Sequence, residues 1–198
     1  MIDEIIKREW KYFTKVSNVG GRAKCQDDFD TFYKQRTAQF KAYDEMTLKC
    51  YLDDLKRYED INFNPMMLKY AYMMKSSDPK SYQELESCLP KKDSMVLELI
   101  DTIVEFEVIM REEFDAQYPH IASLSRHAHS SDDQEDDVSF ETYLRGELMT
   151  YSPKTLYHYG QMIVDMLNKG INMITLIQEE TVRLYGYQSL DDAEEKYK

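Results

Sequence analysis

The chain contains few of the residues that break helices, with 6 glycines and 5 prolines among 198 residues. Its long segments also lack the alternation of apolar and polar residues that marks β-strands. Their apolar residues recur instead with a period of about 3.6 residues. These absences argue against a sheet-based fold. We expect an all-α protein, a single-domain multi-helix bundle covering residues 1–198 with one long central helix.

Cysteine is also scarce, and the 3 cysteines, Cys25, Cys50 and Cys88, form no CxxC pair. An odd number of widely spaced cysteines is typical of reduced thiols. The first residues carry acids where a secretory signal needs bases, and no apolar run approaches the roughly 18 residues of a membrane span. We therefore expect a soluble cytoplasmic protein that has no membrane partner.

Positive charge is in deficit, because 25 Lys and Arg stand against 37 Asp and Glu, for a formal net charge of -12. This excess repels a phosphate backbone, and the chain has no run of basic residues with interleaved aromatics. We expect no nucleic-acid partner. Aromatic residues are plentiful at 13%, with 16 Tyr, and they supply ring surface for a packed core.

Cofactor and catalytic motifs are missing as well. The chain has no Gly-x-Gly-x-x-Gly, Walker-type loop, Gly-x-Ser-x-Gly or His-Glu-x-x-His. A carboxylate-bridged dimetal centre needs Glu-x-x-His pairs, and none of the 4 histidines follows a glutamate at that spacing. We expect neither a cofactor nor a bound metal.

Turn and cap signals divide the chain into helices. The expected helices cover about 2–16, 27–43, 44–58, 65–74, 82–88, 93–117, 139–151, 153–170 and 173–185. Residues 125–138 are polar and aperiodic, which predicts an exposed, mobile loop. The chain after about residue 188 is expected to fray.

Four charged residues, Glu9, Arg36, Glu107 and Glu147, fall at helical spacing on stripes that are otherwise apolar. Burying an unpaired charge is prohibitive, so these groups are expected to pair with one another or to face water in a cavity. The three glutamates are candidates for moving protons. Arg36 and the nearby Gln39 are candidates for binding a ligand.

The stretch Gly20-Gly21-Arg22 lies shortly before Gln26 and a predicted helix start. Glycines let the backbone approach a ligand closely, and amides at a helix start bind anions. We expect these four residues to help bind an anion, with Cys25 between them as a candidate nucleophile.

A purely structural interpretation stays open. In it, the two glycines only end a helix, Asp27 or Asp28 caps the next one, and the four stripe charges form salt bridges in the core. The three acids and one base leave an excess of negative charge that Arg22, Arg145 or Arg111 could offset.

Three blocks of the sequence carry a resemblance: Val19–Asp28, Phe32–Phe40 with Arg36 and Gln39, and Glu141–Ser152. On these blocks, and over nearly its whole length, the chain resembles a bacterial family catalogued only as a domain of unknown function, number 4125. Tyr43 stands where that family is expected to have tryptophan. The resemblance implies no established reaction. It implies that some members occur beside nucleotidyltransferase-like domains, which makes such a protein a candidate partner.

Two functions stay open. The first is a cytoplasmic enzyme or small-molecule binder in which Arg22, Arg36 and Arg145 recognise an anionic group. The second is a non-catalytic module that docks a partner protein through exposed Tyr and Met side chains. We favour the first, because a packing surface has no need of Gly-Gly-Arg and Arg-Gly-Glu blocks. It requires a concave site at which the three blocks converge.

Overall fold

The computed structural model describes residues 1–17, 21–135 and 137–198. Within these ranges the chain forms eleven α-helices and no strand, which confirms the predicted all-α fold. In chain order the α-helices are α1 (Ile2–Phe13), α2 (Phe29–Lys41), α3 (Glu45–Asp60), α4 (Pro65–Ser77), α5 (Pro79–Leu85), α6 (Ser94–Gln117), α7 (Pro119–Ser123), α8 (Phe140–Leu148), α9 (Pro153–Asn168), α10 (Met173–Leu184) and α11 (Leu190–Lys196). The 3-10 helices are η1 (Lys24–Asp27), η2 (Glu86–Cys88) and η3 (Ser130–Asp132).

Side-chain caps set most of the helix starts. Asp28 accepts a hydrogen bond from the backbone N–H of Thr31, and Ser152 accepts one from Thr155. Each bond satisfies an N–H group that the first helical turn leaves without a backbone partner. Pro153 follows Ser152 at the first helical position, where its fixed φ suits the helix. These signals are local, so the sequence predicts the starts well.

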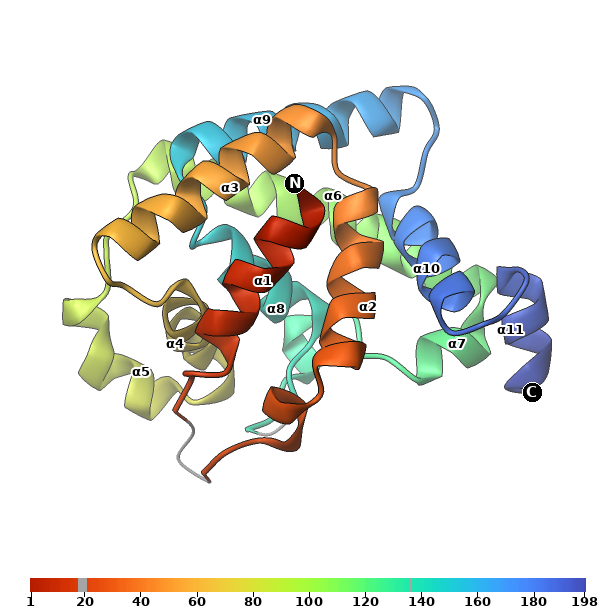
Figure 1. Cartoon of the computed structure of the whole chain (residues 1–198), viewed down its shortest axis with the longest axis horizontal. Helices are drawn as coiled ribbons and strands as arrows, with labels where there is room; N and C mark the ends of the chain where they lie inside the picture. The colour runs from red at the N-terminus through yellow and green to blue at the C-terminus, as the bar shows by residue number, and fades with distance from the viewer. Residues whose placement is uncertain (18–20, 136) are drawn as a thin grey trace.

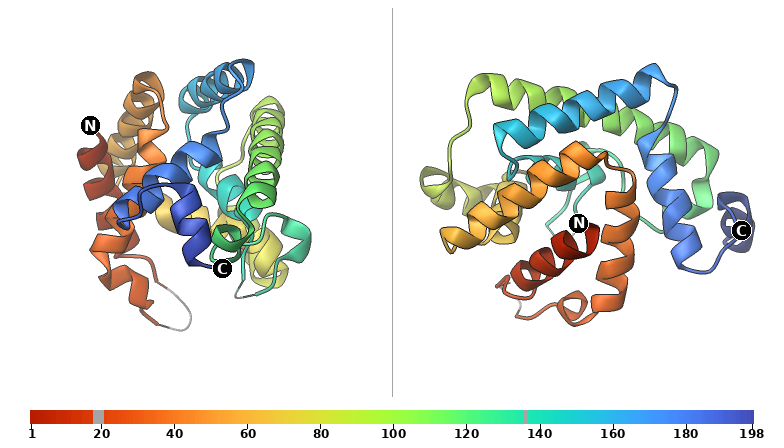
Figure 2. Two further views of the ribbon diagram at one scale, coloured as in Figure 1. Left: turned by 90° about the vertical axis from the view of Figure 1, so that its right-hand side faces the viewer. Right: turned by 45° about the horizontal axis from the view of Figure 1, so that its top comes forward.

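Helix α8 lies near the middle of the view and contacts α4 and α6 (Figure 1). On one side of the molecule lie α1, α2 and α3, and α6 lies on the other (Figure 2). Two further contacts join these sides, because α9 packs on both α3 and α6, and α10 packs on both α2 and α6. The longest helix, α6, has 24 residues. Within the described ranges, no helix has the length and apolar character to cross a bilayer.

Four tyrosines, Tyr43, Tyr51, Tyr151 and Tyr159, are buried together in the core. The ring centroids of Tyr51 and Tyr151 are 4.8 Å apart, and those of Tyr43 and Tyr159 are 5.1 Å apart. A buried phenol hydroxyl needs a hydrogen-bond partner. The core must therefore contain polar groups beside these rings.

In the polar segment 125–138, the only regular helix within the described residues is η3. The carboxylate of Asp133 accepts hydrogen bonds from the hydroxyls of Ser76 and Thr142 and from the backbone N–H of Ser139. Burial alone would raise the pKa of Asp133, but these hydrogen bonds lower it to about 2. They attach the segment to α4 and α8. Its mobility stays a prediction.

The C-terminal segment, which we expected to fray, contains α11. Its Leu190 and Ala193 are buried. The carboxylate of Glu194 accepts hydrogen bonds from the backbone N–H groups of His120 and Ile121, at 2.8 and 2.9 Å. These two N–H groups belong to the first turn of α7, so Glu194 caps α7 from a distant part of the chain.

Candidate functional site

A buried ion pair joins α1 to α2. The Nε of Arg36 donates to Glu9 Oε2 at 2.7 Å, and its Nη2 donates both to Glu9 and to Glu147 Oε1, the latter at 3.1 Å. The Nη1 of Arg36 donates to Gln39 Oε1. Glu147 comes from α8, so three helices meet at one guanidinium group. Three residues that the sequence singled out, Glu9, Arg36 and Glu147, therefore lie together.

Lys69 of α4 completes this group, although the sequence analysis missed it. Its Nζ donates to Glu147 Oε2 at 2.6 Å and lies 3.3 Å from the centroid of the Tyr143 ring. Two cations, Arg36 and Lys69, now balance two carboxylates, Glu9 and Glu147. The formal charge of this buried charge cluster is zero, which is the condition under which a core tolerates ions.

Hydroxyl and amide groups satisfy the remaining lone pairs of the two carboxylates. The hydroxyl of Tyr51 donates to Glu9 at 2.6 Å, and the hydroxyl of Tyr151 donates to Glu147 at 3.2 Å. The side-chain amide of Gln39 donates to Glu147 at 3.1 Å. Two of the four buried tyrosines thus find their partners in the charge cluster.

Gly146 explains how α4 and α8 approach closely enough for Lys69 to reach Glu147. A Cβ atom at Gly146 would lie 2.6 Å from Met73 Cγ and 3.1 Å from the backbone oxygen of Lys69. Any side chain there would push the two helices apart. The glycine of the Arg-Gly-Glu block therefore has a structural role, because it brings a lysine to a glutamate.

The charge cluster is not sealed, because one side of it borders a cavity of about 410 Å³ that we call the central cavity. Arg36, Gln39 and Glu147 line the cavity, whereas Glu9 lies behind them and does not. The other walls come from α6, α9, α10 and the segment after α7. A volume of this size falls within the range of pockets that hold small molecules.

Glu107 projects from α6 into the central cavity, and its side chain is buried. Burial raises the pKa of Glu107, and the hydrogen bond from the Tyr159 hydroxyl at 2.7 Å lowers it. The negative charge of Glu147 raises it further, and the resulting pKa is about 8. Burial would also raise the pKa of Glu147, but the charges of Arg36 and Lys69 hold it far below its usual range. One cavity thus has a neutral and an ionised carboxyl on its wall, the arrangement that separates acid and base roles in enzymes.

Two arginines that the sequence did not assign to the site, Arg111 and Arg126, also line the central cavity. Arg111 pairs with Asp115 at 2.5 Å and donates to the hydroxyl of Ser125. Arg126 donates to the backbone oxygen of Val138 at 2.9 Å, and its guanidinium lies 4.9 Å from the centroid of the Tyr143 ring. No carboxylate in the described part of the chain lies within ion-pair distance of Arg126.

A family model described as "Protein of unknown function (DUF4125)" matches residues 1–195 of the chain. The chain belongs to this family. The match confirms the resemblance that the three sequence blocks indicated, and no curated protein or solved structure matches the chain. Family membership brings no reaction with it, so the function of this DUF4125 protein must be inferred from the cavity.

Of the first of the three blocks, the structure describes residues 21–28, and none of these lines the central cavity of the DUF4125 protein. Arg22 pairs with Asp27 at 2.7 Å and donates to the backbone oxygens of Thr14 and Gln26, both at 2.9 Å. All these groups belong to the connection between α1 and α2. Arg22 therefore stabilises the conformation of a surface loop.

Gln26 is buried, and its side-chain amide donates to the backbone oxygens of Phe13 and Val16, both at 2.9 Å. It thereby satisfies carbonyls at the end of α1, which stops at Phe13 and not near residue 16 as predicted. Gly21 has a φ of +87°, a conformation that only glycine adopts readily. Gly20 lies outside the described residues.

Arg145 lies on the outer side of α8 and forms ion pairs with Asp101 and Glu141. It does not line the central cavity, so the structure separates it from its neighbour Glu147, which does. The three blocks therefore contribute unequally. The second supplies Arg36 and Gln39 to the central cavity, the third supplies Glu147, and the described part of the first supplies no residue to it.

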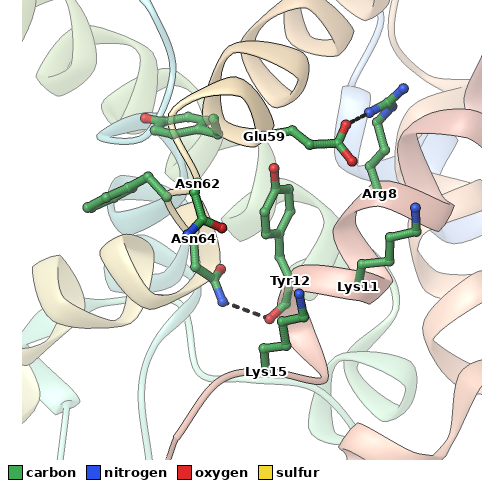
Figure 3. A pocket seen from close by; sticks show the side chains of 9 residues that line it. Arg8, Lys11, Tyr12, Lys15, Glu59, Asn62 and Asn64 are labelled. Atoms are coloured by element: carbon green, nitrogen blue, oxygen red, sulfur yellow. Dashed lines mark hydrogen bonds and ion pairs between the residues drawn. The ribbon is translucent and has the colours of Figure 1, made fainter.

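A smaller surface depression of about 130 Å³ lies between α1 and the turn after α3 (Figure 3). There Arg8 points at Glu59 and pairs with it, and the side-chain amide of Asn64 donates to the backbone oxygen of Tyr12 at 2.9 Å (Figure 3). Lys11 lies in the last turn of α1, where a cation is favoured by the helix dipole. These polar groups join α1 to the end of α3 and to the start of α4, and we assign no ligand to them.

Among the described residues, no three His, Cys, Asp or Glu side chains are grouped as metal ligands. Guanidinium groups, phenols, one protonated carboxyl and one ionised carboxyl line the central cavity.

Proposed function

We propose that the protein binds a small molecule with a carboxylate or phosphate group in the central cavity, and that Glu107 exchanges a proton with it. The observation that carries this proposal is Arg126. It presents a guanidinium to the cavity, and none of the carboxylates in the described ranges neutralises it. Such a group is available to bind an anion by charge-assisted hydrogen bonds.

The charge balance of the cavity favours an anion over a cation. The charge cluster is neutral as a whole, since Arg36 and Lys69 offset Glu9 and Glu147. Arg111 is paired with Asp115. Glu107 is largely protonated at neutral pH, because its pKa is about 8. What remains is the positive charge of Arg126, in a protein whose net charge is -12.

Glu107 has the features of a general acid or base. Its carboxyl is held by the Tyr159 hydroxyl, faces the cavity and titrates close to physiological pH, where proton transfer in either direction is most effective. Strongly perturbed carboxyls in clefts are often functional. These features support the further proposal that the protein is an enzyme that acts on the bound anion.

Anion binding is tested by thermal melts with inorganic phosphate, benzoate and a panel of phosphate monoesters at millimolar concentration. We expect at least one compound to raise the Tm of the wild type. The Arg126→Ala variant should lose this shift, while Arg145→Ala should keep it, because both remove one positive charge but only Arg126 lines the cavity. Equal shifts in all three proteins, or no shift in the wild type, would contradict the proposal.

The role of Glu107 is tested through the pH dependence of affinity for a probe that does not itself titrate, such as benzoate. Between pH 6.5 and 9, roughly, Glu107 loses its proton and adds a negative charge to the cavity, so benzoate affinity should fall in the wild type. In Glu107→Gln the affinity should change little over the same range. A wild-type affinity that is independent of pH would remove Glu107 from the site.

The second function, docking of a partner protein, has one structural feature in its favour. An apolar groove runs between α6 and α9, lined by side chains such as Phe106, Tyr157 and Val164. Its volume is about 110 Å³, and none of its lining residues in the described chain is charged. Nothing in the groove specifies what would cover it, whereas the central cavity has charges that select a ligand. We therefore propose anion binding.

A further inference from the structure

We infer that the ligand is an aromatic anion, with its charged group at Arg126 and its ring in a second cavity beside the first. This inference rests on the proposed function, because it names the class of molecule that the central cavity takes.

The second cavity, which we call the aromatic cavity, has a volume of about 310 Å³. It lies between α1, α2, α4 and α8 and shares four lining residues with the central cavity: Gln35, Arg36, Arg126 and Tyr143. The two cavities are thus neighbours. Arg126, stacked over the ring of Tyr143, stands at the boundary between them and can reach a group in either one.

Aromatic rings form most of the apolar wall of this second cavity. Phe13, Phe32, Tyr70 and Tyr143 line it, together with the thioether-bearing side chain of Met66. Rings and sulfur atoms pack favourably against the face and edge of another ring. Burial raises the pKa of Tyr70, so its phenol stays neutral and adds no charge to this wall. An aromatic group therefore fits the cavity better than a polar one.

The charges at the cavity wall orient the ligand. Asp28 is the one carboxylate among the described lining residues of the aromatic cavity, and its hydrogen bonds with Thr31 lower its pKa, which keeps it ionised. It repels an anionic group from that end. Arg36 is already bound by Glu9, Glu147 and Gln39. The anion is thus directed to Arg126, and the ring points away from it toward α1 and α4.

The volumes suit this assignment. An engineered cavity of about 150 Å³ in a protein core holds benzene, and the aromatic cavity is larger than that. An anionic group at the boundary leaves most of the central cavity for further parts of the ligand, next to Glu107. The proton exchange proposed for Glu107 would then take place on that side of the ligand.

The test compares three probes by isothermal titration calorimetry: inorganic phosphate, butyl phosphate and phenyl phosphate. We expect phenyl phosphate to bind about tenfold more tightly than inorganic phosphate, because burial of its ring adds hydrophobic free energy. It should also bind more tightly than butyl phosphate, because the wall is aromatic. Butyl phosphate binding as tightly as phenyl phosphate would overturn the assignment of a ring.

A variant that fills the aromatic cavity tests whether the ring of the ligand binds there. Thr31 is exposed, lines this cavity and contributes its backbone N–H to the cap of α2, which a change of side chain preserves. Thr31→Trp should fill the cavity and reduce phenyl phosphate affinity to that of inorganic phosphate, leaving inorganic phosphate affinity unchanged. The control Thr31→Ala, which removes the same hydroxyl without filling the space, should bind phenyl phosphate as the wild type does.

Alkylation of Cys25 provides an independent test, because this exposed thiol lines the aromatic cavity. Cys88 is also exposed but does not line the cavity. Phenyl phosphate should slow alkylation of Cys25 by iodoacetamide, followed by mass spectrometry, and should leave Cys88 unaffected. Equal rates at Cys25 with and without the probe would contradict the inference.

The two proposals fail in different ways. If neither benzoate nor any of the three phosphates binds the wild type, the proposed function is overturned. If inorganic and phenyl phosphate bind equally, depend on Arg126 and are unaffected by Thr31→Trp, the central cavity still binds anions and only the aromatic assignment is overturned.

Discussion

Arg36 and Arg22 each bind a carboxylate, but the first pair lies in the core and the second on the surface. The side chains of Arg36 and Glu9 are 7% and 0% exposed, whereas those of Arg22 and Asp27 are 48% and 66% exposed. At the surface, water replaces a lost partner. In the core Glu9 is fully buried, so water cannot replace Arg36 and the charge of Glu9 would stay unsolvated. The exposed pair therefore stabilises only its own loop, whereas the buried pair contributes to the stability of the whole fold.

The largest effect is expected from Arg36→Leu. Glu9 and Glu147 would keep only Lys69 as a cation, and breaking a buried pair costs about 3–5 kcal/mol. This is a large part of the stability of an average domain. Urea denaturation followed by circular dichroism should show a strongly reduced midpoint or an unfolded protein. A wild-type midpoint with intact anion binding would show that Arg36 holds neither the core nor the site.

A second effect comes from Glu107, a buried carboxyl that forms no ion pair with a cation in the described part of the chain. Its folded pKa of about 8 lies above the value of about 4.3 for an unfolded chain, so the folded state retains its proton more strongly. Glu107 therefore favours folding most at low pH, and this contribution is lost as pH rises from about 4 through 8. The loss amounts to roughly a few kcal/mol.

Glu107→Gln should remove this dependence. Wild type and variant should differ in Tm between pH 5 and pH 8.5, with the variant gaining on the wild type as pH rises. Glu105→Gln, an exposed change on the same helix, is the matched control and should follow the wild type at every pH. Parallel Tm profiles for all three proteins would contradict the raised pKa.

A third effect separates two glycines in helices. Gly146→Ala inserts a Cβ atom between α8 and α4, where overpacking costs about 1–3 kcal/mol against a helix-propensity gain of about 1 kcal/mol. At Gly160 of α9 the nearest atoms would lie at 3.5 Å, an ordinary contact, so Gly160→Ala should keep the propensity gain and stabilise the protein. Urea midpoints should move in opposite directions. Two shifts of the same sign would count against close packing of α8 on α4.

The smallest effect is expected from Arg22→Leu, the surface counterpart of Arg36→Leu. The loop between α1 and α2 loses an ion pair and two hydrogen bonds to backbone oxygens, all of which water can replace. The urea midpoint should barely change, and hydrogen exchange should increase only in this loop. A loss of stability comparable to that of Arg36→Leu would erase the distinction between the two pairs.

The same contrast explains what the sequence could predict. Glu9, Arg36, Glu107 and Glu147 were singled out because each interrupts an apolar stripe at helical spacing, and all four are buried. The periodicity of a helix shows which of its residues face the core. It does not show which helices meet, so the joining of α1, α2 and α8 at Arg36 emerged only from the structure.

The positions of three arginines and one lysine relative to the site could not be predicted from the sequence. Lys69 was missed because α4 is apolar on several sides, so a charge there interrupts no clear stripe. Arg126 lies in an aperiodic segment, where position carries no information about direction. Arg22 and Arg145 were placed at the site because they sit in distinctive blocks, but the loop bonds of Arg22 and the outward face of Arg145 depend on tertiary contacts.

Glu147 also has a consequence for how the chain is made. It lies 111 residues beyond Arg36 and 78 beyond Lys69, and both cations need it. During synthesis the ribosome releases Glu9, Arg36 and Lys69 long before α8, so the growing chain has two cations and one acid with no interior to share. The N-terminal half of the chain therefore cannot bury Arg36 and Lys69 in a neutral cluster until Glu147 has been synthesised. Until then these side chains stay hydrated.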